Sequence, residues 1–90
     1  MAITVRVPTQ LRTLTGGREE VSADGATVGA VIDAIEAAHP GLKDRLLDAK
    51  GIRRFINLYL NDEDVRFLDG LGTAVKEGDS LTVVPAIAGG

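Results

Sequence analysis

One stretch of this chain has the apolar spacing of an amphipathic helix, and this restricts the fold more than any other feature. Its apolar positions recur every three or four residues, at Val28, Val31, Ile32 and Ile35. Thr27 can cap the first turn, because its hydroxyl can accept a hydrogen bond from an unpaired backbone N–H. Pro40 and Gly41 end the helix, because proline lacks the amide hydrogen and glycine suits the chain reversal.

The other periodic segments have the pattern of β-strands. Residues 3–7 alternate apolar and polar side chains, and Pro8 should end this strand because it cannot donate a ladder hydrogen bond. After a turn at residues 16–17, a second strand is expected to run back as a hairpin with a long loop. This second strand is predicted at 18–22, and the remaining strands are predicted at 55–60, 65–67 and 81–84. The run 55–60 favours an interior strand covered on both faces, and Pro85 is expected to stop the last strand.

This order of elements predicts the fold class. One main helix must cover one face of a mixed sheet of four to five strands, which is a two-layer α+β arrangement. The β-grasp (ubiquitin-like) fold is such an arrangement, with its first and last strands parallel in the centre. Residues 42–47 suggest one further helical turn, and 48–51 a loop. We expect a single β-grasp domain at 1–85 and a C-terminal tail at 86–90.

Composition excludes several classes of protein. The chain of 90 residues has no cysteine, which rules out disulfides, thiolate zinc sites, cysteine-ligated iron–sulfur clusters and a cysteine nucleophile. The net charge of −3 argues against a general nucleic-acid binder. The N-terminal residues lack the pattern of a signal peptide, and no stretch is long and apolar enough to span a bilayer. We therefore expect a cytoplasmic protein that binds neither nucleic acid nor membrane.

Charge is unevenly distributed along the chain. The middle is basic, with Lys43, Arg45, Lys50, Arg53 and Arg54. The last third is acidic, with Asp62, Glu63, Asp64, Asp69, Glu77 and Asp79. Both runs can be solvated surface; alternatively, one of them orients a protein partner during encounter.

No catalytic or metal-binding constellation is found in the sequence. His39 is the only histidine, and its place beside Pro40 favours a helix-end role. The acidic run 62–64 resembles a cation loop but has Arg66 where a calcium loop needs an oxygen ligand. The segment 70–72 begins like a dinucleotide fingerprint, yet Val75 occupies the third glycine position. We expect no enzyme activity, no metal site and no cofactor bound by this chain.

The C-terminal residues are the candidate functional site. Pro85 fixes its own φ and directs the chain out of the last strand, and Ala86, Ile87 and Ala88 extend it. The five residues after Pro85 reach at most about 17 Å. Without a Cβ, Gly89 and Gly90 can pass through a narrow channel. Two terminal glycines can also be a frayed end. The interpretation therefore rests on the residues that precede them more than on the glycines themselves.

Such an end suits acyl activation. A free carboxylate, with a pKa of about 3.5, is unreactive at neutral pH. If ATP converts it to an acyl-adenylate, a sulfur donor can displace AMP and leave a thiocarboxylate on Gly90. The sulfur is then a nucleophile carried on an extended arm.

At these residues the sequence resembles the ThiS/MoaD family of ubiquitin-like sulfur carriers, and within it the CysO-type branch that serves cysteine biosynthesis. The segments that carry the resemblance are 27–32, 39–42, 55–67 and 77–90. It implies a β-grasp fold and activation by a MoeB/ThiF-type adenylyltransferase with ATP. It also implies delivery of sulfur to a pyridoxal-phosphate-dependent cysteine synthase that uses O-phosphoserine. Cysteine would then be joined to Gly90 and released by a metalloprotease. ATP, pyridoxal phosphate and metal would all belong to these partners.

The sequence leaves the place of two aromatic side chains and the exact function open. Phe55 and Tyr59 share one face of their predicted strand, and they either pack in the core or dock on partner enzymes. The tail chemistry also fits the small subunit of molybdopterin synthase, and a Gly-Gly end fits a ubiquitin-like protein modifier. A plain binding module is the remaining alternative.

Overall fold

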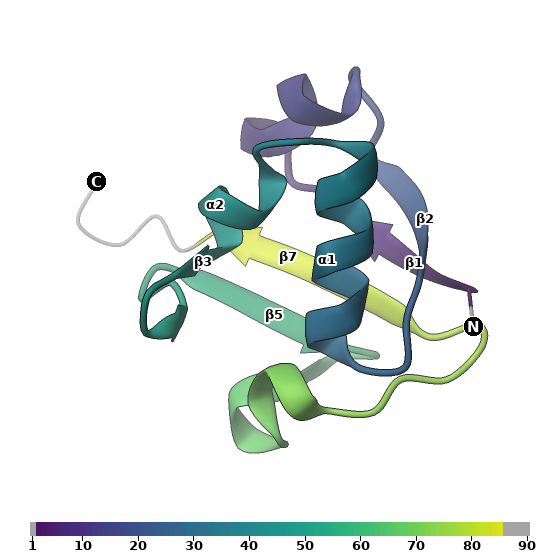
Figure 1. Cartoon of the computed structure of the whole chain (residues 1–90), viewed down its shortest axis with the longest axis vertical. Helices are drawn as coiled ribbons and strands as arrows, with labels where there is room; N and C mark the ends of the chain where they lie inside the picture. The colour runs from purple at the N-terminus through teal and green to yellow at the C-terminus, as the bar shows by residue number, and fades with distance from the viewer. Residues whose placement is uncertain (1, 86–90) are drawn as a thin grey trace.

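The fold is built on a five-stranded sheet in which the first and last strands lie side by side (Figure 1). The computed structural model describes residues 2–85. The strands are β1 (Ala2–Arg6), β2 (Glu20–Asp24), β5 (Ile56–Leu60), β6 (Glu63–Asp64) and β7 (Ser80–Pro85), in the order β2-β1-β7-β5-β6. β1 and β7 are parallel, with Val5 beside Leu81, and every other pair is antiparallel. This topology confirms the predicted β-grasp fold.

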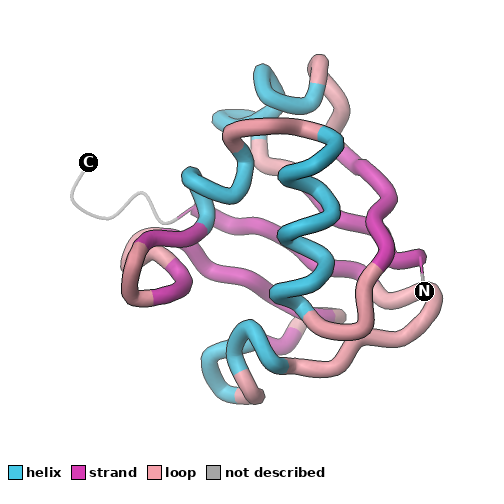
Figure 2. The backbone as a smooth tube through the Cα atoms, in the orientation of Figure 1, coloured by secondary structure: helices cyan, strands magenta, loops and turns pink. Residues whose placement is uncertain are grey.

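Helix α1 (Val28–Ala38) crosses one face of this sheet (Figure 2). The Thr27 hydroxyl accepts a hydrogen bond from the Ala30 N–H at 3.2 Å, so the predicted N-cap is confirmed. His39 is the C-cap, and its backbone N–H donates to the Ile35 carbonyl at 2.7 Å. All four apolar positions predicted for the helix are buried against the sheet.

The core between the two layers is aliphatic. Its fully buried large side chains are Ile3, Val5, Val28, Val31, Ile32, Ile35, Leu42, Leu46, Leu58, Val65 and Leu81. Burying one such side chain contributes about 1.5–3 kcal/mol, so a core without aromatic residues still holds a domain of this size together. No helix within residues 2–85 has the length and apolar character that a membrane crossing requires.

Two additions frame one end of the sheet. The predicted second helical turn is α2 (Leu42–Leu46), and it is followed by a small hairpin of β3 (Leu47–Asp48) and β4 (Gly51–Ile52). The loop predicted at 48–51 is therefore largely the turn of that hairpin. A 3-10 helix, η1 (Thr9–Thr15), fills the long β1–β2 connection.

Several strand predictions were inaccurate. β1 begins and ends one residue before the predicted 3–7, and the strand predicted at 18–22 is β2, two residues further on. β5 is not covered on both faces: Ile56, Leu58 and Leu60 are buried, whereas the residues between them are only half-buried. The strand predicted at 65–67 is the 3-10 helix η2 (Val65–Phe67), because the Asp64 carboxylate accepts the Arg66 N–H and caps a helical turn there. Pro85 is the last residue of β7 rather than a stop beyond it.

The tight turn after β5 is tied to the start of β7 through Asn61. Its side-chain oxygen accepts from the Ser80 N–H, and its amide group donates to Asp79 Oδ1, each at 2.9 Å. Asp79 Oδ2 accepts from the Lys76 N–H at 2.7 Å. Asn61 has a φ of 49°, a left-handed conformation that asparagine tolerates better than most residues. This network fixes the end of the β5–β7 pair that lies opposite Pro85.

Replacing Gly25 with alanine is expected to destabilise the fold. An added Cβ would lie 2.7 Å from the backbone nitrogen of Val31 and 2.9 Å from its Cγ2. Neither atom can move away without disturbing the first turns of the helix or the packing of a buried side chain. The free energy of unfolding should fall by about 1–3 kcal/mol, measured by urea denaturation. Gly72→Ala is the control, since no atom lies within 4 Å there and the change should be within about 0.5 kcal/mol. Equal stability of the two variants would contradict the close approach at Gly25.

The hydrogen bond from Asn61, followed by that from the Lys76 backbone, lowers the pKa of Asp79 below its ordinary value of 3.8. A lowered folded-state pKa means that ionised Asp79 stabilises the fold above the unfolded-state pKa, and that this contribution is lost as pH falls through the folded-state pKa. Asp79→Asn should therefore be less stable than wild type at pH 7, with a difference that shrinks below about pH 4. Urea titrations of both proteins across pH 2–7 test this. A difference independent of pH would contradict it.

Candidate functional site

The sheet fixes the point from which the C-terminal residues leave. Pro85 ends the central strand β7, and it is paired with Ile56 of β5. Ala86, Ile87, Ala88, Gly89 and Gly90 lie outside the described residues, so the functions predicted for them stay predictions. Five residues span at most about 17 Å, and any enzyme that acts on Gly90 must therefore come close to Pro85.

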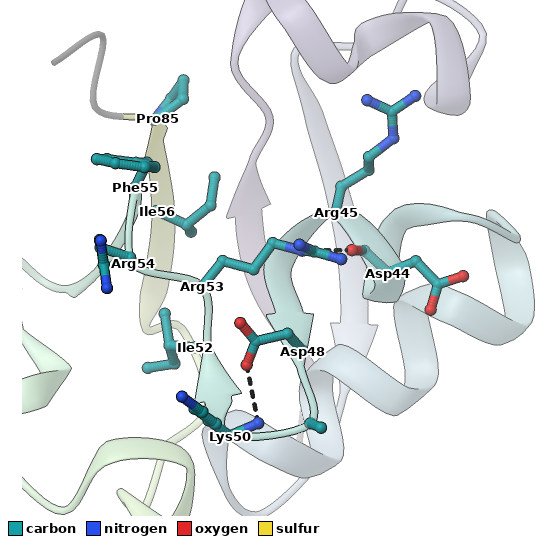
Figure 3. A pocket seen from close by; sticks show the side chains of 11 residues that line it. Asp44, Arg45, Asp48, Lys50, Ile52, Arg53, Arg54, Phe55, Ile56 and Pro85 are labelled. Atoms are coloured by element: carbon teal, nitrogen blue, oxygen red, sulfur yellow. Dashed lines mark hydrogen bonds between the residues drawn. The ribbon is translucent and has the colours of Figure 1, made fainter. Parts of the chain in front are cut away.

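A groove of about 1020 Å³ opens beside Pro85 (Figure 3). It is formed by α2, the β3–β4 hairpin, and the segment that leads into β5. Its charged lining residues are Asp44, Arg45, Asp48, Lys50, Arg53 and Arg54, and its apolar ones include Ile52, Phe55 and Ile56. The antiparallel pairing of β5 with β7 brings this segment to the root of the tail.

Arg66 holds the segment that carries Phe55. Its Nη2 donates to the carbonyls of Arg53 and Ile56 at 2.8 and 2.7 Å, and its Nη1 donates to Asn57 Oδ1 at 2.7 Å. The Ile56 N–H also donates to the Arg53 carbonyl, which closes the turn at 3.0 Å. A guanidinium fork can hold several acceptors at once, so Arg66 fixes the backbone on both sides of Phe55. In the sequence, Arg66 stood out only as an obstacle to calcium binding, and no local pattern indicates its distant acceptors.

The two aromatic residues do not pack in the core. Phe55 is 52% exposed and precedes β5, while Tyr59 is half-buried within β5, opposite the core residues. Four residues of strand separate them by about 13 Å, so they do not form one cluster. Other exposed apolar side chains, which no sequence pattern indicated, are Phe67, Leu68 and Val84. Val84 lies beside Asn57 on the same open face of the sheet as Tyr59.

The charged runs occupy different regions of the structure. Of the predicted basic run, only Lys43 does not line the groove. Its Nζ lies 2.6 Å from Asp33 Oδ1, and this hydrogen bond raises the pKa of Lys43. Asp62 lies in the turn after β5, Glu63 and Asp64 form β6, and Glu77 and Asp79 precede β7. Because β5 and β7 are antiparallel, this acidic end is opposite the groove and Pro85. Asp69 is the exception, because it lines a cavity with Lys50 and Ile52 on the groove side.

The motifs considered for a catalytic or metal site belong to helix ends and turns in the described part of the chain. Across residues 2–85, no three acidic or histidine side chains are placed to hold one metal ion. His39 caps α1, Asp64 caps η2, and the glycines at 70 and 72 belong to the 3-10 helix η3 (Gly70–Gly72). Each of these residues therefore has a structural role.

Comparisons with known proteins agree with this geometry. The ThiS family model matches residues 5–90. The sulfur carrier protein CysO of Mycobacterium tuberculosis strain H37Rv is 53% identical, with 100% of each chain covered. A chain in the crystal structure of the Amycolatopsis orientalis BexX/CysO complex superposes with a TM-score of 0.93 at 56% identity, covering 98% of this chain and 99% of that one. Small archaeal modifier protein 3 of Haloferax volcanii is 40% identical over 74% of this chain and 73% of its own length.

Replacing Arg66 with lysine should loosen the turn that carries Phe55. A single ammonium cannot satisfy acceptors on Arg53, Ile56 and Asn57 at once. We expect a loss of about 1–2 kcal/mol in unfolding free energy, and faster hydrogen exchange at the Ile56 amide. Arg6→Lys is the control, because its ion pair with Glu20 is exposed and its replacement should change stability little. Unchanged exchange at Ile56 would contradict the assigned role.

Proposed function

Because this chain belongs to the ThiS family, we propose that it is a sulfur carrier protein that transfers sulfur as a thiocarboxylate on Gly90. One observation carries the proposal: its likeness to a CysO protein covers the whole length of both chains, so the region compared includes Gly89 and Gly90 of this chain. A fold match alone would be weaker support, since one fold serves many functions.

Sulfur transfer requires that a partner enzyme can reach and activate the C-terminal carboxyl group. The Gly90 carboxylate attacks the α-phosphorus of ATP and releases pyrophosphate, which gives an acyl-adenylate. A sulfur donor at the oxidation level of sulfide then attacks the carbonyl carbon, AMP leaves, and Gly90 bears the thiocarboxylate. The fold supports this function by fixing Pro85 at the end of the central strand, while an adenylyltransferase of the MoeB/ThiF type supplies the catalytic groups.

We assign the carrier to cysteine biosynthesis. The assignment is supported by relatives that bear the name CysO, at 53% identity over their full length. The acceptor enzyme is then a pyridoxal-phosphate-dependent synthase that uses O-phosphoserine, and a metalloprotease releases cysteine from Gly90. In this scheme the chain acts in the cytoplasm and is a cosubstrate rather than an enzyme. ATP, pyridoxal phosphate and the metal all act within its partners.

Partner recognition is assigned to the region around the tail. Pro85 and the predicted tail residues Ala86, Ile87 and Ala88 lead Gly89 and Gly90 into the partner. Phe55 is the described side chain best placed to assist, because it is exposed beside Pro85 and lines the same groove. Tyr59 belongs to the open sheet face further from the tail, so its contribution should be smaller.

A ubiquitin-like modifier is the second candidate function. The match to small archaeal modifier protein 3 favours it, although that match covers less of the chain at lower identity. Conjugation would join Gly90 to lysine side chains of other proteins. The molybdopterin synthase alternative has no comparable support.

Mass spectrometry of the protein from its native host tests the proposal. We expect intact protein with the mass gain of one oxygen replaced by sulfur, formed again in vitro with adenylyltransferase, ATP and a sulfur donor. Transfer of that sulfur to O-phosphoserine rather than to a pterin precursor identifies the pathway. A C-terminus that stays an unmodified carboxylate under these conditions would refute the carrier proposal. Isopeptide-linked Gly90 on other proteins would favour the modifier function.

Changing the end of the chain should abolish transfer without affecting the fold. Deleting Gly90, or adding one residue after it, removes the correctly placed carboxyl group. We expect no thiocarboxylate, together with a melting temperature within about 2 °C of wild type, because residues 2–85 form the packed domain. A variant extended by one residue before Met1 is the control and should accept sulfur normally. A large loss of stability would instead assign the tail a structural role.

A further inference from the structure

The groove beside Pro85 has more basic than acidic side chains, on a protein that is negative overall. It is lined by four of the chain's ten basic residues but only two of its thirteen acidic ones. The chain as a whole has a net charge of −3. Positive charge is therefore concentrated where the tail begins.

These basic groups are available to a partner. Within residues 2–85, neither the Arg45 nor the Lys50 side chain makes a hydrogen bond or an ion pair with another side chain. The Arg53 side chain donates to the backbone carbonyl of Asp44, which leaves its charge uncompensated there. The Arg54 guanidinium lies 6.0 Å from the centre of the Phe55 ring, and both side chains border the groove (Figure 3). A flat cation beside an exposed aromatic ring is a common element of protein interfaces.

The short tail limits how far its enzyme can lie from this groove. Gly90 lies at most about 17 Å from Pro85 along the chain, and Pro85 itself lines the groove, so an enzyme that reacts with Gly90 must approach this region. The opposite end of the β5–β7 pair carries Asp62, Glu63 and Asp79. Basic side chains therefore predominate in the groove beside Pro85, and acidic ones predominate at the opposite end of the β5–β7 pair.

We infer that this groove docks an acidic protein surface at the mouth of the enzyme channel that receives the tail, and that the charge separation orients the carrier tail-first during encounter. The inference rests on the proposed carrier function and adds to it the chemistry of the partner surface. Complementary charge raises association rates and suppresses wrong orientations more than it strengthens the final complex. An acidic entrance attracts the groove and repels the acidic end of the same molecule.

The experiment compares two double charge reversals with the same change in net charge. Arg45→Glu with Lys50→Glu alters the groove, whereas Arg18→Glu with Lys76→Glu alters exposed positions outside it. The second-order rate constant of adenylation, measured as pyrophosphate release at limiting carrier, should fall about tenfold for the groove variant in low salt and much less for the control. Raising the salt concentration should bring wild type and groove variant together, because ions screen the attraction. Melting temperatures verify that both variants are folded.

Several outcomes would overturn the inference. Equal slowing of both variants would mean that net charge matters and the groove does not. Unchanged rates for the groove variant, with wild-type thiocarboxylate still forming, would refute the docking surface but leave the carrier function intact. Absence of thiocarboxylate on wild type would instead refute the carrier function.

A dimer in low salt that the groove reversal abolishes would assign the groove to a second copy. Changes in the NMR chemical shifts of backbone amides throughout the groove, on deletion of residues 86–90, would mean that the tail itself occupies the groove.

Discussion

The parallel pairing of β1 with β7 is the contact on which the rest of this structure depends. It joins Val5 to Leu81, residues from opposite ends of the chain, and each contributes a fully buried side chain to the core under α1. Contacts so distant in sequence form only when the intervening elements are in place, which makes the domain cooperative. The same pairing puts the last strand in the middle of the sheet, so the tail starts from a strand that has a neighbour on each side.

Local patterns were sufficient to predict the elements that bury a regular apolar face. The helix, its Thr27 cap and its four buried positions followed from spacing alone, as did the alternation of β1. The short segment after β5 could not be placed in this way. There the carboxylate of Asp64 accepts a backbone hydrogen bond and caps a helical turn, which replaces strand pairing. This preference for a turn depends on hydrogen bonds, so the apolar periodicity of the sequence does not indicate it.

The candidate site was predictable in composition but not in arrangement. A basic run near the middle of the chain is visible in the sequence, yet its position beside Pro85 depends on the register that pairs Ile56 with Pro85. The exposure of Phe55 depends likewise on Arg66, whose acceptors lie up to 13 residues away. Interactions of this kind are set by tertiary packing, so short motifs carry no signal for them.

The central position of β7 also determines how the domain bears mechanical load. An enzyme that draws the tail into a channel pulls along the axis of this strand, from Pro85. β7 is paired with β5 at residues 81–85 and with β1 at residues 80–82, so the pull acts in shear on the β5 ladder and, further along the strand, on the β1 ladder. The bonds share the force instead of opening one after another, as they would in an edge strand peeled from its sheet. A pull on Pro85 therefore loads the domain along its strands, the direction in which the hydrogen bonds of a ladder resist together.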